Sequence, residues 1–275
     1  MRLVDSHAHL QAAPFGSDLA EVIAAAELAG VERILVPGWD LASSAAALDL
    51  VIRFPALAAA VGVHPHAAAT TDDGAWASVA ALAAEPAVVA IGETGLDYDR
   101  MYSPPEAQLA NLRRNLDLAL ATGKPAILHC RSRPGTRDAQ DALLAELRAA
   151  GFGGAAGDRA FGDRPPAILH SVSGPVDYVA AALDLGLSVS VSGLAFRAGE
   201  EATAEAVRLV PADRLLVETD APYLAPPGAP RRRNEPAWVA VIARWVAERR
   251  GEDPAATGAG LVAAFDRVFP ARAAG

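Results

Sequence analysis

The sequence contains very little cysteine and lysine, and both shortages limit the sites that it can build. Cys130 is the only cysteine among 275 residues, so the chain cannot form an internal disulfide or a cysteine-based zinc cluster. Lys124 is the only lysine among the 24 basic residues, and arginine supplies the rest. Any metal site must therefore use histidine and carboxylate ligands.

The sequence also lacks the segments that mark membrane and secreted proteins. It has no run of about 18 uncharged apolar residues, so we expect no membrane span. Asp5, His7 and His9 interrupt the first apolar residues, so we find no signal peptide and expect a cytoplasmic protein. The net charge of −9 disfavours non-specific coating of nucleic acid, but it does not exclude a nuclease whose positive charge comes from bound metal.

Short β-branched runs alternate with Ala- and Leu-rich segments of helical period along the whole chain. This βαβα pattern is typical of a parallel sheet. Eight runs have the character of strands: 2–10, 31–37, 58–64, 87–93, 126–131, 167–171, 187–192 and 214–220. Eight parallel strands close a (β/α)8, or TIM, barrel. We therefore predict an α/β fold of this type, with residues 1–275 forming a single domain.

The segments between and after these runs are predicted to be helical. Residues 107–122 and 175–185 repeat apolar side chains at intervals of three and four, which indicates helices with one buried face. Two C-terminal helices, at about 236–250 and 254–269, are expected to close the barrel. A helix at about 138–150 precedes a Gly-, Arg- and Asp-rich segment, 151–166, which we interpret as an excursion on the active-site side or a mobile loop.

All six histidines lie at or just beyond the C-terminal end of a predicted strand. They are His7, His9, His64, His66, His129 and His170. In a barrel these ends converge on one mouth, where active sites are built. Because side chains alternate along a strand, His7 and His9 face the same way, and Arg131 faces with His129.

Histidine and carboxylate side chains are the ligands of zinc, manganese and similar cations, and carboxylates also bind magnesium. A pair of cations about 3.5–4 Å apart needs a bridging anion, and we assign Glu93, which ends the fourth predicted strand. One cation is expected to bind His7, His9 and Glu93. The other is expected to bind Glu93, His129 and His170.

Asp220 ends the eighth predicted strand and is assigned to the first cation. It would lie close to the attacking water, so it can act as ligand and general base at once. With Glu93 it forms our predicted catalytic pair. Asp5 and Glu218 also point inward by alternation, either to orient a ligand histidine or as buried hydrogen-bonding acids.

Five further residues are predicted to contact substrate rather than metal. His64, His66 and Arg131 are expected to hold the scissile phosphate or to protonate the leaving group. A loosely held third cation at His64 or His66 is an alternative. Arg233 and Asn234 follow the eighth strand and are expected to contact the next phosphate, although such a basic run is often only a solvated loop.

The order of the motifs resembles the TatD-type metal-dependent deoxyribonucleases. The motifs are Asp-Ser-His-Ala-His (5–9), Gly-Val-His-Pro-His (62–66), Gly-Glu-Thr-Gly-Leu-Asp-Tyr (92–98), Leu-His-Cys-Arg (128–131), His-Ser-Val-Ser-Gly (170–174), Glu-Thr-Asp-Ala-Pro-Tyr-Leu (218–224) and Arg-Asn-Glu-Pro (233–236). The resemblance implies a TIM barrel of the amidohydrolase superfamily with two divalent cations, Mg, Mn or Zn. It also implies a deoxyribonuclease, often a 3′–5′ exonuclease, that acts on single-stranded or frayed DNA without an obligate protein partner.

The same resemblance assigns the family's metal ligands to the six residues already chosen. The chain departs from the family pattern at Ser171-Val172, where Cys-Phe is usual, and in a longer segment before the sixth strand. Neither change removes a ligand, but both put the substrate preference in doubt.

Two other kinds of protein remain as alternatives. One is another metal-dependent phosphoester, lactone or amide hydrolase on the same barrel; its lysine-bridged members are disfavoured because Glu93 ends the fourth strand and Lys124 precedes the fifth. The other is a catalytically silent metal-binding protein, which is disfavoured because every expected ligand is present.

Overall fold

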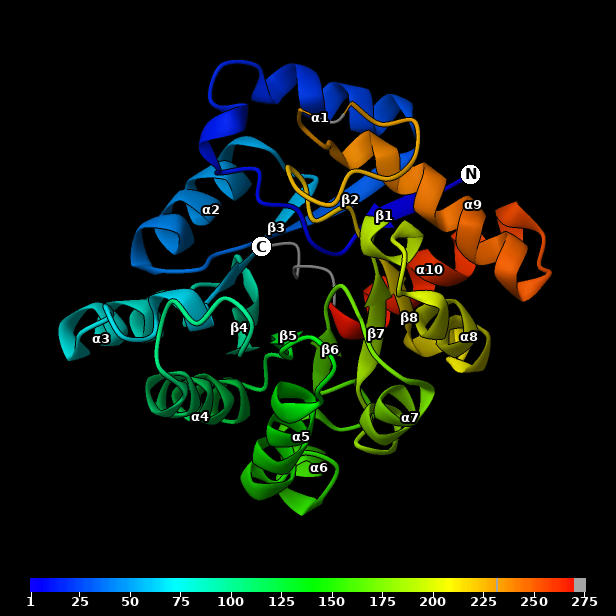
Figure 1. Ribbon diagram of the computed structural model, residues 1–275. Coiled ribbons are helices and arrows are strands. Elements are labelled where there is room, and N and C mark those ends of the chain that lie inside the picture. Colours follow the sequence, from blue (N-terminus) through cyan, green and yellow to red (C-terminus); the bar gives the residue numbers. More distant parts are fainter. Residues whose placement is uncertain (231, 270–275) are drawn as a thin grey trace.

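The computed structural model describes residues 1–230 and 232–269, and its eight strands form one parallel sheet wrapped into a barrel (Figure 1). The strands pair in sequence order. They are β1 (Leu3–Asp5), β2 (Val31–Pro37), β3 (Leu57–Val61), β4 (Val88–Asp97), β5 (Ala126–Arg131), β6 (Ala167–Leu169), β7 (Ser188–Val191) and β8 (Leu215–Val217). Backbone hydrogen bonds join the first and last strands, because Ser6 N donates to Val217 O at 3.0 Å and Asp220 N donates to His7 O at 2.9 Å.

Helices follow the strands and form an outer ring around the barrel (Figure 1). The α-helices are α1 (Leu19–Leu28), α2 (Leu41–Arg53), α3 (Asp73–Leu82), α4 (Pro105–Thr122), α5 (Asp138–Ala150), α6 (Ala155–Phe161), α7 (Val176–Asp184), α8 (Glu201–Leu209), α9 (Val239–Arg250) and α10 (Pro254–Val268). Short 3-10 helices are η1 (Ala13–Phe15), η2 (Pro65–Ala67), η3 (Gly193–Phe196), η4 (Ala212–Arg214) and η5 (Pro236–Trp238). The predicted (β/α)8 barrel is confirmed.

The apolar core has two layers, because each strand buries side chains on both of its faces. The larger layer lies between the outer face of the sheet and the surrounding helices. The smaller layer fills the barrel with one side chain from each of seven strands: Val4, Leu35, Ala60, Ala90, Ile127, Ile168 and Leu216. Burial on both faces explains why the strands read as continuous apolar runs rather than as alternating ones.

Helix α10 closes the barrel at the end opposite the histidines. Its residues Val262, Phe265 and Val268 belong to the same cluster as the interior side chains of the strands, and the rings of Phe265 and Phe269 lie 4.8 Å apart. The expectation that the C-terminal helices close the barrel is therefore correct for α10. Helix α9 begins three residues later than predicted, because 236–238 form a 3-10 turn.

Six strands end at other residues than predicted, and only β2 and β5 end where the sequence placed them. β1 and β8 stop at Asp5 and Val217, so His7 and Asp220 stand just beyond their strands. β4 continues to Asp97, so Glu93 lies within the strand and not at its end. The pairing of β4 with β5 shifts register between Ile91 and Thr94, and this irregularity accompanies the placing of Glu93 in the mouth.

The segment 151–166 is not the active-site excursion that the sequence suggested. It contains helix α6 and lies at the N-terminal ends of the strands, because α5 has already carried the chain back from the mouth. Arg164 Nη2 donates to Gly123 O at 2.9 Å, directly before β5, and Arg267 Nη2 of α10 donates to Asp163 O at 2.8 Å. The segment therefore belongs to the closed end of the barrel.

In the described part of the chain, no helix combines the length and apolar character that crossing a bilayer requires. The single-domain organisation over 1–275 stays a prediction, since 231 and 270–275 lie outside the described residues.

We expect Gly95→Ala to destabilise the barrel strongly. Gly95 pairs with His129 between β4 and β5, its φ is 137°, and an added Cβ would overlap the carbonyl oxygen of His129. Backbone strain and overpacking together should lower the free energy of unfolding by about 2–6 kcal/mol. Denaturant titration followed by circular dichroism measures this change.

Gly135→Ala is the matched control for that variant. Its φ of 75° is also positive, but a Cβ there would meet nothing within 4 Å. Only the strain of a positive φ remains, so we expect the free energy of unfolding to fall by about 1–2 kcal/mol. Equal losses for the two variants would contradict the close approach of β4 to β5.

Candidate metal centre

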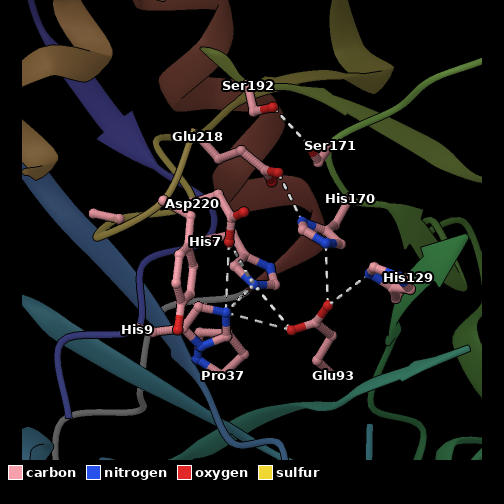
Figure 2. Close-up of polar contacts among 12 residues, drawn as sticks. His7, His9, Pro37, Glu93, His129, His170, Ser171, Ser192, Glu218 and Asp220 are labelled. Carbon is pink, nitrogen blue, oxygen red and sulfur yellow. Dashed lines mark hydrogen bonds and ion pairs between the residues drawn. The ribbon is translucent and has the colours of Figure 1, made fainter. Parts of the chain in front are cut away.

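The mouth of the barrel gathers five of the six histidines around the carboxylate of Glu93. Figure 2 shows four of them, His7, His9, His129 and His170, with Glu93. We call Glu93, Asp220 and these five imidazoles the histidine–carboxylate centre; the imidazoles belong to His7, His9, His64, His129 and His170. They reach one place because they lie at or just beyond the C-terminal ends of four strands, β1, β3, β5 and β6, and the ends of parallel strands converge in a barrel. Glu93 is 3% exposed, so its charge is almost fully removed from bulk water.

The first half of the centre surrounds Oε2 of Glu93. His7 Nε2 lies 3.3 Å and His9 Nε2 3.5 Å from that oxygen. The same two nitrogens lie 3.7 Å and 3.5 Å from Oδ1 of Asp220, and 3.1 Å from each other. Four donor atoms from β1, β4 and β8 therefore face one point.

The second half surrounds the other oxygen of Glu93, Oε1. His170 Nε2 lies 3.1 Å, His129 Nδ1 3.2 Å and His64 Nε2 3.3 Å from it. The structure thus gives His64 the same contact with Glu93 as the two predicted ligands, His129 and His170. The sequence had placed His64 with the substrate contacts.

The donor spacing fits divalent cations. Metal–nitrogen and metal–oxygen bonds of about 2.0–2.2 Å in tetrahedral geometry place ligand atoms roughly 3.3–3.5 Å apart, and the contacts in both halves run from 3.1 to 3.7 Å. Nε2 of His7 and Nε2 of His9, 3.1 Å apart, are within hydrogen-bond distance of each other and are also close enough to bind one cation together. The opposite nitrogens, Nδ1 of His7 and of His9, are buried without a hydrogen-bond partner among the described residues.

The electrostatics of the centre also favour cations. Burial would raise the pKa of Glu93, but the surrounding imidazoles, His64 and His170 foremost, hold it well below its ordinary value, so Glu93 is a carboxylate. Burial lowers the pKa of His64 to about 4, which keeps this imidazole neutral at pH 7. Burial would also lower the pKa of His9, His129 and His170, but the carboxylates outweigh burial and raise it, because the centre attracts positive charge. Metal binds carboxylates and neutral imidazoles, so a cation would displace any proton held by these three side chains.

Acids behind the imidazoles fix their orientation. Glu218 is fully buried, and its Oε1 lies 2.8 Å from Nδ1 of His170. Burial would lower the pKa of His170, but Glu218 and Glu93 outweigh it and raise that pKa well above its ordinary value. Of the two roles left open for Glu218, the contact favours orientation of a histidine.

Asp5 has the other role, that of a buried hydrogen-bonding acid. Its Oδ1 accepts from Thr219 N at 2.9 Å and from His7 N at 3.2 Å, and its Oδ2 accepts from Thr219 Oγ1 at 2.5 Å. Burial raises the pKa of Asp5 to about 8. These bonds tie the end of β1 to the end of β8, and so hold His7 and Asp220 together.

Sequence reasoning missed Asp97. Its Oδ2 lies 2.8 Å from Nε2 of His66 and 3.3 Å from Nε2 of His129, and the side chain is 1% exposed. Alternation along β4 was a usable signal, because Glu93, Gly95 and Asp97 share one face of the strand. His66, the sixth histidine, contacts Asp97 and not Glu93.

The remaining predicted substrate residues divide into two groups. His66 and Arg131 have side chains 34% and 46% exposed at the mouth, and Arg131 Nε lies 3.1 Å from Asp99 Oδ2. Arg233 and Asn234 instead form hydrogen bonds within the fold, and their phosphate contacts stay predictions.

The partners of Arg233 and Asn234 explain that difference. Arg233 donates to both carboxylate oxygens of Asp18 at 2.8 Å and to Oε1 of Glu235 at 2.6 Å. Asn234 is fully buried and donates to Thr219 O and Tyr223 O. Its side chain therefore shapes the loop after β8.

Fold and site together define a β/α-barrel protein with a histidine–carboxylate centre at its mouth. The family described as TatD related DNase matches residues 4–270. The 3′-5′ ssDNA/RNA exonuclease TatD of Erwinia billingiae is 37% identical over 263 residues, which cover 93% of this chain and 94% of that protein. The 3′-5′ ssDNA/RNA exonuclease TatD of Salmonella typhimurium is 35% identical, and the match covers 97% of this chain and 100% of that protein. The chain belongs to the TatD related DNase family.

Solved structures agree with this assignment. A crystal structure of a TatD homologue from Escherichia coli K12 matches with a TM-score of 0.85 at 27% identity, and 98% of each chain is covered. A TatD family hydrolase from Entamoeba histolytica matches with the same TM-score at 21% identity, again over 98% of each chain, which shows the shared fold.

We expect Glu218→Gln to weaken metal binding without unfolding the barrel. The amide keeps the shape of the side chain but removes the charge that orients His170. Removing such a partner typically costs about 10–100-fold in metal affinity. Competition with a chromophoric chelator measures the affinity, and Glu205→Gln on the exposed face of α8 is the control. An affinity unchanged from wild type would show that Glu218 does not act through His170.

Proposed function

We propose that this chain is a divalent-metal-dependent nuclease that hydrolyses phosphodiester bonds of single-stranded nucleic acid from the 3′ end. The observation that carries the proposal is the position of Glu93, whose two oxygens each face a separate group of imidazoles. A carboxylate in this position can bridge two cations. The names of the relatives at 35–37% identity supply the substrate class and the polarity.

The residues of the centre would hold two cations, Mg, Mn or Zn. His7, His9 and Asp220 would bind one, and His64, His129 and His170 would bind the other. Glu93 would bind both. Bound cations supply Lewis acidity, which lowers the pKa of water from about 15.7 towards 7 and neutralises charge on the phosphate.

We assign Asp220 as the acceptor of the proton of the attacking water. Its side chain is 13% exposed, so it borders the open mouth. Burial would raise its pKa, but His9 and the neighbouring imidazoles outweigh burial and keep it below the ordinary value, so Asp220 is an acceptor at neutral pH.

We assign His66 and Arg131 to the scissile phosphate. Both reach the mouth from positions beside the centre, and both are oriented by a carboxylate, Asp97 for His66 and Asp99 for Arg131. A guanidinium suits a phosphate because it donates two parallel hydrogen bonds. His66 can also donate a proton to the leaving oxygen.

Substitutions of Glu93 and Asp220 test their two proposed roles separately, that of Glu93 as a ligand of both cations and that of Asp220 as the proton acceptor. Glu93→Gln should reduce the metal content below one ion per chain, because it weakens a ligand of both cations. Asp220→Asn should lower the rate by about 10²–10⁴-fold, because no acceptor for the proton of water remains. Elemental analysis gives the metal content, and a degradation time course on end-labelled single strands with Mg, Mn and Zn in turn gives the rate.

Glu205→Gln is again the control and should match wild type in both measurements. Full metal content together with full rate in either acid variant would show that the assignment is wrong. Parallel assays with a lactone and a phosphotriester distinguish a nuclease from the other hydrolases of this barrel, and faster turnover of either would contradict the proposed substrate class.

Arg131→Ala should impair catalysis and leave the metal content intact. A charge-assisted hydrogen bond contributes about 1.5–3 kcal/mol, so kcat/KM should fall roughly 10- to 150-fold. Steady-state kinetics on a short single strand measures the effect, and Arg148→Ala on the exposed face of α5 is the control. Loss of metal from Arg131→Ala would instead give Arg131 a structural role.

A further inference from the structure

An open groove lies beside the histidine–carboxylate centre and is used by none of the steps above. Its volume is about 820 Å³, within the range of about 300–1,000 Å³ for ligand pockets. The segment 222–229 after β8 forms one wall. Phe196 and Arg197, which follow β7, and Pro14 from the loop after β1 form much of the rest.

Tyr223 stands where the groove meets the centre. Its side chain is 59% exposed, and the centroid of its ring lies 6.0 Å from that of His9. The backbone beneath the ring is fixed, because Tyr223 N donates to Asp220 O at 2.8 Å and Asn234 Nδ2 donates to Tyr223 O at 2.7 Å. An aromatic face is therefore held open to solvent three residues from the predicted general base.

Positive charge lines the same groove. Arg197 and Arg232 are both exposed there, and neither forms an ion pair with a carboxylate in the described part of the chain. Their neighbour Arg233 differs, since its guanidinium is fully engaged by Asp18 and Glu235. The protein as a whole has a net charge of −9, but these two arginines make the groove locally positive. Together with the exposed ring of Tyr223, they favour a ligand that is an anion and carries flat apolar groups.

We propose that this groove binds the nucleotides adjacent to the scissile phosphate, with a base stacked on Tyr223 and backbone phosphates paired with Arg197 and Arg232. The inference rests on the proposed nuclease function and adds a binding subsite to it. Stacked aromatic rings and basic side chains are how proteins bind single strands without reading their sequence. A duplex would hide its base faces from Tyr223, so the groove selects single-stranded substrate.

The loop geometry supports a rigid subsite. A Cβ on Gly193 would overlap the carbonyl oxygen of Leu224, so the start of η3 packs directly against the wall that carries Tyr223. Gly193 and Tyr223 both line the groove. The ring and the arginines are thus presented by two loops in backbone contact, which limits the entropy lost when a strand binds.

The test measures binding of a fluorescent phosphorothioate oligo(dT), which resists cleavage, by the metal-loaded protein. Tyr223→Leu should weaken binding about fivefold or more, because stacking on an aromatic ring is lost. Tyr223→Phe keeps the ring and should bind like wild type. Arg197→Ala and Arg232→Ala should each reduce the slope of log Kd against log salt concentration by about 0.7, whereas Arg148→Ala should leave it unchanged.

The outcomes separate this inference from the proposed function. If wild type cleaves single strands but Tyr223→Leu binds them as tightly as Tyr223→Phe, the groove inference is overturned and the nuclease stands. Unchanged salt slopes in both arginine variants would also overturn it. If wild type neither binds nor cleaves single strands, both proposals fail. Metal content equal to wild type in every variant confirms that the centre is undisturbed.

Discussion

The structure depends on one buried carboxylate surrounded by imidazoles. Glu93 is 3% exposed, and each of its oxygens faces imidazole nitrogens from strands that are far apart in the sequence. Burying a charge is costly unless partners compensate it, and here the compensation comes from five histidines. The same arrangement that makes the buried charge tolerable also brings together groups of side chains that could hold a metal ion, on both sides of the carboxylate.

The barrel is what makes this arrangement possible. Its closed end is filled by apolar side chains and covered by α10, so the open end alone is free to carry polar groups. The seam between the first and last strands is fixed by Asp5, which links His7 to Thr219, and places Asp220 beside the histidines of β1. Residues at the closed end of the barrel therefore stabilise the fold, whereas residues at the open end form the site.

Much of this could be predicted because it follows from local pattern. The succession of strand-like and helical segments predicted the barrel. Alternation along strands and the convergence of strand ends then predicted that His7, His9 and Glu93 lie together, and the structure brings them together. Alternation along β4 would also have identified Asp97, but the predicted strand ended at Glu93 and β4 continues to Asp97. The roles of Arg233 and Asn234 could not be predicted, since Asp18 is 215 residues from Arg233 and no local pattern reports such a partner. The side of the barrel on which 151–166 lies follows from the direction of α5, which composition does not reveal.

The central claim is that Glu93 lies between two cations, and a crystal grown with manganese tests it most directly. Data collected at the manganese absorption edge should show two anomalous peaks about 3.5–4 Å apart, one on each side of the Glu93 carboxylate. A map with no peak at the mouth of the barrel, or with manganese bound only at sites remote from Glu93, would contradict the account.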